Sequence, residues 1–115
     1  MIQIDLPWPS KDLSPNARVH WAEKHRTAKK HREDAHWRTK PHGPIEADKA
    51  IVTITAYPPT RAAFDDDNFI ARCKAYLDGI ADGLEVNDRA FRIQPLRRGE
   101  PIKGGNVRFE IEVPQ

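Results

Sequence analysis

The stretch that decides the fold is residues 50–84, which read AIVTITAYPPTRAAFDDDNFIARCKAYLDGIADGL. Its first eight residues, from Ala50 to Tyr57, are mostly apolar or β-branched and end at Pro58-Pro59, as is typical of a buried strand. After three aspartates, apolar residues recur at three- and four-residue steps, which predicts an amphipathic helix over about 68–84. A buried strand followed by such a helix is typical of an α/β protein.

The flanking sequence predicts the remaining elements. Alternating apolar residues at 2–6 and 107–113 indicate strands, and a short strand is expected at 91–93. A helix with a weak apolar stripe is expected at about 19–39, largely exposed. The order β, α, β, α, β, β predicts a mixed α/β fold: a small mixed sheet packed by two main helices, in one domain covering residues 1–115.

The run Asp65-Asp66-Asp67 stands between the predicted strand and the predicted helix. One interpretation is structural, because carboxylates there cap free N–H groups and complement the positive end of the helix dipole. That explains one aspartate, or two, but three adjacent carboxylates repel one another unless a cation relieves the repulsion. Oxygen ligands of this kind suit a hard divalent cation such as Mg²⁺.

Two further groups follow along the chain. At ~100° per residue, Lys74 and Asp78 fall on nearly the same helical line as Asp67. The alternative is that Lys74 and Asp78 form only a surface ion pair at i,i+4. Asp88 either folds back toward the start of this helix or is an ordinary turn residue. Phosphodiester hydrolysis combines carboxylate-held metal ions, which activate a water, with a cation that neutralises the phosphate.

Composition narrows the function classes. The 115 residues carry 19 Lys and Arg against 17 Asp and Glu, and the basic residues flank an acidic centre, as expected for a protein that holds a polyanion. Cys73 is the single cysteine, so no intrachain disulfide forms. No apolar run is long enough to span a membrane and no signal peptide is evident, so a cytoplasmic protein is expected. Neither a zinc motif nor a phosphate-binding glycine loop is present, and no organic cofactor is expected.

The chain resembles the RusA family of Holliday junction resolvases (crossover junction endodeoxyribonucleases). Three stretches carry the resemblance, and together they span nearly the whole sequence. They are Leu6-Pro7-Trp8-Pro9 with Ser14-Pro15-Asn16; Asp65-x-Asp67-Asn68, Lys74-x-x-x-Asp78-Gly79-Ile80 and Asn87-Asp88; and Lys103-Gly104-Gly105 before the last strand.

The resemblance implies a homodimeric α/β nuclease that uses Mg²⁺, or Mn²⁺ in its place, and nicks opposing strands of four-way DNA junctions. It assigns Asp65, Asp67 and Asp88 to catalysis and to the metal, and Lys74 to catalysis. A metal-bound water would attack the phosphorus and leave a 5′-phosphate and a 3′-hydroxyl. Small resolvases of this family, which act in DNA recombination and repair, are often carried by prophages.

Three positions depart from the family pattern. Ala71 stands where the family commonly has lysine, and Lys74 follows three residues later, nearly one helical turn. Arg72 is the other candidate for the catalytic cation. Asn87 replaces the first acid of the usual pair, and Asp66 is an extra acid.

Basic residues outside the acidic centre are expected to grip DNA backbones in a salt-sensitive, sequence-independent way. These candidates are Arg18, Lys24, Arg26, Lys29, Lys30, Arg72, Arg97, Arg98 and Lys103. Trp21 or Trp37 could stack on unpaired bases, with at least one of the two expected in the core.

Three other functions fit the same residues. The first is a resolvase-like protein that binds branched DNA without turnover, which the displaced lysine favours. The second is a metal-dependent nuclease acting on flaps or RNA. The third is a charge-rich structural protein whose aspartates only cap a helix.

Overall fold

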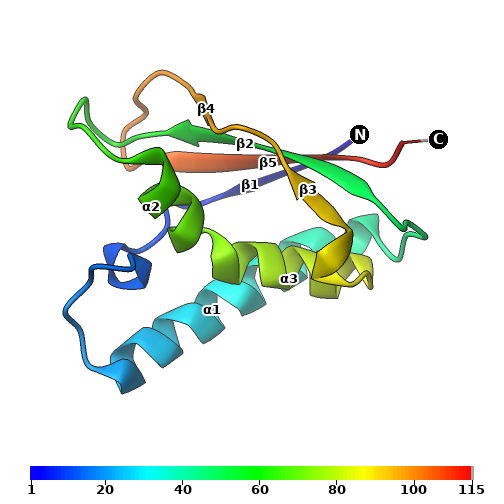
Figure 1. Cartoon of the computed structure of the whole chain (residues 1–115), viewed down its shortest axis with the longest axis horizontal. Coiled ribbons are helices and arrows are strands. Elements are labelled where there is room, and N and C mark those ends of the chain that lie inside the picture. Colours follow the sequence, from blue (N-terminus) through cyan, green and yellow to red (C-terminus); the bar gives the residue numbers. More distant parts are fainter. Residues whose placement is uncertain (115) are drawn as a thin grey trace.

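The computed structural model describes residues 1–114, in which a mixed β-sheet carries its α-helices on one face (Figure 1). The strands lie in the order β1-β5-β2-β3, and β4 also pairs with β2. The elements are β1 (Ile2–Leu6), α1 (Trp21–Thr39), β2 (Ala50–Tyr57), α2 (Asp66–Arg72), α3 (Lys74–Leu84), β3 (Phe91–Ile93), β4 (Arg97–Arg98) and β5 (Asn106–Glu112).

Strand β5 lies between β1 and β2 and is antiparallel to both. Strands β3 and β4 run parallel to β2 and share its outer edge, with Ala50 opposite Phe91 and Thr55 opposite Arg97. The mixed sheet and the four predicted strands are therefore confirmed. Strand β4 was not predicted, because two consecutive arginines show no apolar alternation.

Alternate residues of β1, β2 and β5 face the helices and form the core. They pack against the apolar side of α3, where Leu77, Ile80 and Leu84 are buried. The sheet contributes these side chains: Ile4, Leu6, Val52, Ile54, Val107, Phe109 and Ile111.

The helix predicted over 68–84 is wrong as a single element, because the chain forms two helices there. Cys73 separates α2 from α3, and its backbone N–H donates to Phe69 O (3.2 Å) and Ile70 O (3.0 Å). The axis changes direction at this residue (Figure 1). Buried Cys73 still continues the apolar stripe, but the helical line expected to join Asp67 to Lys74 is interrupted.

Close backbone packing joins α1 to α3. A Cβ atom added to Gly79 would lie 2.2 Å from the Arg32 carbonyl oxygen, and one added to Gly83 would lie 2.8 Å from Thr39 Cβ. Beside this contact, Arg32 Nε and Nη2 donate to the two carboxylate oxygens of Asp82 at 2.7 and 3.0 Å. As expected, most of α1 is exposed, since it buries only Ala35 and Thr39.

The expectation that Trp21 or Trp37 packs in the core is wrong, because their exposed fractions are 70% and 64%. The close contact of α1 with α3 is made instead by small side chains, with Gly79 against Ala35 and Gly83 against Thr39. Trp8 is the tryptophan that packs against the core, with its ring 4.6 Å from that of Phe69.

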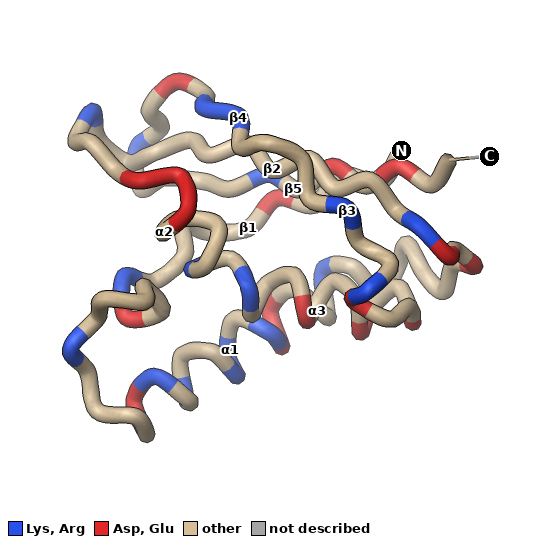
Figure 2. Tube along the Cα trace, in the orientation of Figure 1, with Lys and Arg blue, Asp and Glu red and all other residues tan. Residues whose placement is uncertain are grey.

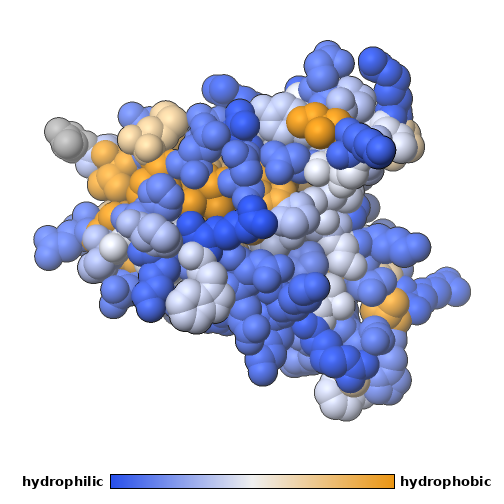
Figure 3. Space-filling model, turned by 180° about the vertical axis from the view of Figure 1, so that it is seen from behind, coloured by the Kyte–Doolittle hydropathy of each residue, from blue (hydrophilic) through white to orange (hydrophobic). Residues whose placement is uncertain are grey.

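Strand β1 forms an edge of the sheet, and α1 reaches over it. Arg38 Nη1 donates to the backbone oxygen of Asp5 at 2.8 Å. Figure 3 shows the reverse side of the molecule, where hydrophilic residues predominate and apolar residues gather toward the end that carries the two chain termini. Among residues 1–114, no helix is long and apolar enough to cross a membrane.

Candidate functional site

A hollow of about 390 Å³ lies along the polar side of α3. Lys74, Asp78 and Asp82 follow one another at four-residue steps, so they share one side of this helix. Arg32 reaches the hollow from α1, and Asp88 reaches it from a 3₁₀ turn at Asp88–Ala90. Charged side chains from three separate segments therefore meet at one place.

Lys74 lies at the centre of this group. Its Nζ is 2.7 Å from Asp78 Oδ1 and 3.5 Å from Asp88 Oδ2. The hydrogen bond with Asp78 is the main cause that raises the pKa of Lys74, so its ammonium group stays protonated. The ion pair between Lys74 and Asp78, the alternative considered from the sequence, is present. Asp88 folds back to Lys74 at the start of α3 and not to the aspartates where the predicted helix was expected to begin.

The turn that carries Asp88 is organised by its neighbour. Asn87 Oδ1 accepts a hydrogen bond from the backbone N–H of Arg89 at 2.9 Å and so caps the 3₁₀ turn. An amide oxygen at this position supplies the cap without adding a further negative charge beside Asp88. The departure of Asn87 from the acidic pattern therefore has a local structural role.

The three aspartates at the N-terminus of α2 have three different environments. Asp65 caps the helix, since its Oδ1 accepts from the backbone N–H of Asn68 at 3.0 Å, which confirms the capping interpretation for this residue. Asp66 Oδ1 accepts from Arg98 Nε at 2.9 Å. The Asp67 carboxylate accepts no hydrogen bond within residues 1–114. Within the described chain, Asp67 thus keeps both carboxylate oxygens unused, and Asp65 and Asp66 each keep one.

The acidic residues of this region form two separate groups (Figure 2). Helix α2 lies between them and rises about 9 Å from Asp66 to Arg72 at 1.5 Å per residue. Across the described chain, no three His, Cys, Asp or Glu side chains form a preassembled metal site. The structure brings Asp88 to Lys74 and does not bring it to Asp65 and Asp67.

Arg72, the other candidate cation, holds the proline-rich loop. Its Nε donates to Ser10 O at 3.2 Å, and its Nη2 donates to Pro9 O. The guanidinium also lies 5.8 Å from the ring centre of Trp8. Burial lowers the pKa of Arg72. Because these contacts occupy its donors, Lys74 is the better placed of the two cations.

The candidate DNA-binding residues do not share one surface. Arg18, Lys24, Arg26, Lys29 and Lys30 lie on or just before the first half of α1. Lys103 lies in the turn before β5. Arg98 turns toward Asp66, whereas Arg97 lines a hollow on the other side of the sheet with Glu110 and Glu112. Adjacent residues of a strand point to opposite faces, which explains the separation.

The sequence analysis did not select Asp78, Asp82 or Arg32 as site residues. The four-residue spacing of Lys74, Asp78 and Asp82 is a signal that would have found the two aspartates. Arg32 is far from them in sequence, and nothing at its position indicates the contact. Buried Cys73 has a pKa raised to about 12 by burial, so it stays a thiol at neutral pH and has no role as a nucleophile.

Fold and site together define a mixed α/β protein with a Lys–Asp–Asp cluster on one helix and an exposed acidic run one short helix away. No protein-family model matches the sequence. The chain is 45% identical over 117 residues to an uncharacterized protein of Xylella fastidiosa (strain Temecula1 / ATCC 700964), an alignment that covers 96% of this chain and 76% of that protein. The chain belongs to the same family as that protein.

Proposed function

We propose that this protein is a Mg²⁺-dependent, structure-specific endodeoxyribonuclease that resolves four-way DNA junctions by paired nicks. The observation that carries the proposal is the arrangement on α2 and α3. Carboxylates with unused oxygens, Asp65 and Asp67, begin the first helix, and a protonated lysine held by two carboxylates begins the second. The similarity of these residues to the RusA pattern supports the same activity.

The residues present fit a magnesium ion in their chemistry. Asp65 uses one oxygen in a single hydrogen bond and Asp67 uses none within the described chain, so both retain hard oxygen donors. When bound, the ion would lower the pKa of a coordinated water and stabilise charge on the reacting phosphate. The RusA resemblance adds Asp88 to the ligands, although here Asp88 contacts Lys74. Mn²⁺ offers the same preference for oxygen ligands.

Lys74 supplies positive charge to the phosphate. Its hydrogen bond to Asp78 fixes the position of the ammonium group and keeps it protonated. Asp88, at 3.5 Å, limits the movement of Lys74 on the other side. A cation held in place in this way stabilises the charge that develops on a phosphate oxygen without having to reorganise. The chain thus provides an ordered cation before DNA binds.

The basic first half of α1 would hold the DNA backbone. In Figure 2, Lys and Arg positions of α1 lie beside the acidic positions of α3. Lys24 Nζ has only a 3.5 Å contact to the Ser14 carbonyl oxygen within the described chain, so it remains available to a phosphate. Contacts of this kind do not depend on base sequence. They weaken as the salt concentration rises, because the release of counterions from DNA on binding then becomes less favourable.

A homodimer would provide two sites for two nicks. A two-fold axis through the dimer matches the symmetry of a four-way junction. The apolar residues that gather on the reverse side of the molecule (Figure 3) support a contact between copies, because such patches mark interaction surfaces.

A second candidate is a protein that binds branched DNA without cutting it. The separation of Asp65 and Asp67 from Asp88 favours this candidate, because the three carboxylates do not meet around one ion. In that case Lys74 would contribute only binding energy.

Cleavage of an end-labelled four-way junction tests the proposal. Wild type and Asp67→Asn are compared with Mg²⁺, with Mn²⁺ and with EDTA, and flap, duplex and RNA substrates are run in parallel. Symmetric nicks by wild type, and binding without nicks by Asp67→Asn, are the expected results. Binding without cutting by wild type in both metals would establish the second candidate, and preferred cutting of flaps or RNA would reassign the substrate.

A further inference from the structure

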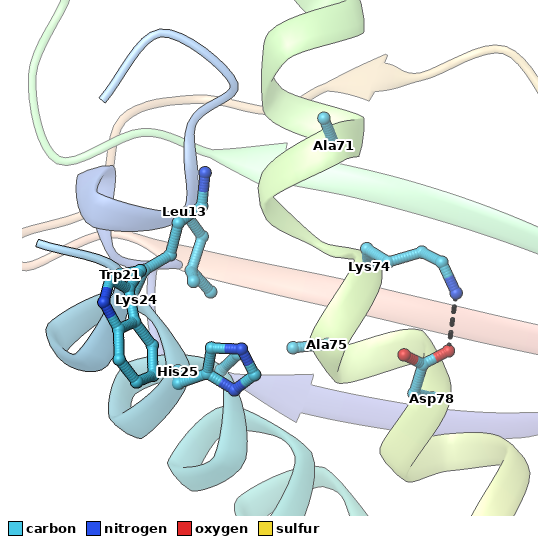
Figure 4. A pocket seen from close by; sticks show the side chains of 9 residues that line it. Leu13, Trp21, Lys24, His25, Ala71, Lys74, Ala75 and Asp78 are labelled. Atoms are coloured by element: carbon cyan, nitrogen blue, oxygen red, sulfur yellow. Dashed lines mark hydrogen bonds and ion pairs between the residues drawn. The ribbon is translucent and has the colours of Figure 1, made fainter. Parts of the chain in front are cut away.

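A second hollow, of about 450 Å³, lies between the first half of α1 and the start of α3. Trp21, Lys24 and His25 line it from α1, and Ala71 and Ala75 line it from the opposite side. Figure 4 shows the His25 ring turned toward Ala75, with Trp21 on the far side of His25 and the bonded Lys74 and Asp78 beyond Ala75. Lys74 and Asp78 also line the hollow of the candidate site, so the two hollows adjoin and share these two residues.

The fold itself does not require an indole at position 21. Trp21 is the first residue of α1, its exposed fraction is 70%, and it lies outside the core. The rings nearest to it belong to His20 and His25, with centroids at 5.6 and 5.9 Å. The other exposed tryptophan differs, because Lys40 Nζ lies 4.9 Å above the ring of Trp37 and Trp37 does not line this hollow.

The shape and charge of the hollow fit one kind of occupant. Small alanine side chains line one wall of the hollow, and the aromatic rings of Trp21 and His25 line the other. The volume falls within the range of about 300–1,000 Å³ that is usual for small-molecule sites. The carboxylate among its lining residues, Asp78, is already paired with Lys74, so Lys24 supplies a free positive charge at the rim. A flat aromatic group attached to a negatively charged backbone matches both features.

We infer that this hollow binds an unpaired nucleobase of a DNA strand, stacked on Trp21, and so positions the adjoining phosphate toward Lys74. This inference rests on the proposed function for its choice of DNA as the ligand. Base stacking on an aromatic side chain tolerates any base, in agreement with recognition of structure rather than sequence. Lys24 contacts the backbone of the same nucleotide, and Lys74, which lines both hollows, places that backbone beside the candidate site.

The test uses two short single strands, an oligodeoxythymidine and an abasic strand of the same length, bound in EDTA and followed by fluorescence anisotropy. Removing the bases while keeping the phosphates separates stacking from electrostatic attraction. Wild type is expected to bind the thymidine strand about tenfold more tightly than the abasic strand. Trp21→Ala is expected to lose that preference, and Trp21→Phe is expected to keep most of it.

Trp37→Ala is the matched control, because it removes an equally exposed tryptophan from the same helix. It is expected to retain the wild-type preference, and circular dichroism verifies that all variants are folded. Equal binding of the thymidine and abasic strands by wild type would overturn the inference, as would an unchanged preference in Trp21→Ala, which would leave the hollow to a ligand other than a base.

The outcome is distinguishable from that of the proposed function. Base preference is measured without metal and does not depend on cleavage. A Trp21-dependent preference in a protein that never cuts junctions would support the nucleobase site and contradict the nuclease. If the protein cleaves junctions but Trp21→Ala keeps the base preference of wild type, the nuclease would be supported and the nucleobase site contradicted.

Discussion

Two acidic regions of the molecule use their carboxylates differently. One is the acidic run Asp65-Asp66-Asp67 at the N-terminus of α2, and the other is the acidic side of α3. On α3, Asp78 and Asp82 each hold a cation of the chain itself, Lys74 and Arg32. At the N-terminus of α2, Asp66 is paired with Arg98 and Asp65 caps the helix, while Asp67 has no partner within residues 1–114. Carboxylates that are satisfied internally contribute to packing and order, whereas those with unused oxygens remain available to a ligand.

The two regions also differ in how firmly they are attached. Helix α3 is pressed against α1 at Gly79 and Gly83 and is clamped by Arg32 and Asp82. Helix α2 is short and is held through Phe69 in the core and through the pair of Asp66 with Arg98. We therefore expect substitutions in the contact of α3 with α1 to change stability strongly, and substitution of the unpaired carboxylate of Asp67 to leave stability nearly unchanged.

The largest effect on stability is expected from Gly79→Ala. Its new methyl group would lie 2.2 Å from the Arg32 carbonyl oxygen, so the backbones of α1 and α3 would have to separate. We expect a loss of about 3 kcal/mol in the free energy of unfolding, measured by urea denaturation. Asp67→Asn, in the other acidic region, should change it by less than about 0.5 kcal/mol. Equal losses would show that the two regions are attached alike.

The next effect concerns Lys74→Met, which removes the charge and keeps most of the side-chain length. Junction cleavage should fall about 100-fold, which corresponds to about 2.7 kcal/mol of transition-state stabilisation. Junction binding should change little, as measured by gel shift. Lys49→Met is the control, since Lys49 is exposed and lies outside both hollows of the site region. A similar loss in both variants would contradict a specific role for Lys74.

A smaller effect is expected from Arg98→Gln, which frees Asp66 and removes the guanidinium 3.9 Å from the ring centre of Phe64. The pair is about half exposed, so solvent screening limits the cost to about 1 kcal/mol. Arg97→Gln, on the neighbouring residue, should change stability by less than about 0.5 kcal/mol. Thermal unfolding of both variants measures the difference, and an equal shift would show that Arg98 does not hold the acidic run.

The smallest effect appears only in acid and involves His31 on α1. Burial lowers the pKa of His31 below 6.5, and its Nε2 accepts a hydrogen bond from the backbone N–H of Ser10 at 3.1 Å. Below pH 6.5 the unfolded chain therefore binds more protons than the folded one. The contribution of neutral His31 to the free energy of unfolding is therefore complete above pH 6.5. It is lost as the pH falls from 6.5 through the lower pKa that His31 has in the folded chain.

Urea denaturation at pH 7.5 and pH 5.5 measures this loss. His31→Gln should lose less stability between the two values than wild type does. The ion pair of Arg32 with Asp82 should persist at pH 5.5. The hydrogen bond from Arg32 lowers the pKa of Asp82 below 3.8, so this carboxylate stays ionised. A larger loss in His31→Gln than in wild type would contradict the assignment.

The sequence predicted the parts of the fold that repeat with a clear period. Strands β1 and β5 alternate, β2 was recognised as a β-branched run that ends at two prolines, and α1 begins and ends within two residues of the expected limits although its apolar stripe is weak. The break at Cys73 was not predictable, because the apolar spacing continues through it. The pair Lys74–Asp78 was predictable from its four-residue spacing. The contact of Arg32 with Asp82 was not, because it depends on how α1 lies across α3.

The hydrogen bond from Arg38 to the Asp5 backbone oxygen has a consequence for how the protein behaves when crowded. A bare strand edge recruits the strands of other chains and begins aggregation. Here the Arg38 side chain occupies one of the backbone acceptors on the β1 edge, which discourages edge-to-edge extension of the sheet. A second copy that paired with β1 along its length would first have to displace Arg38. Association of two copies through packed side chains avoids that cost.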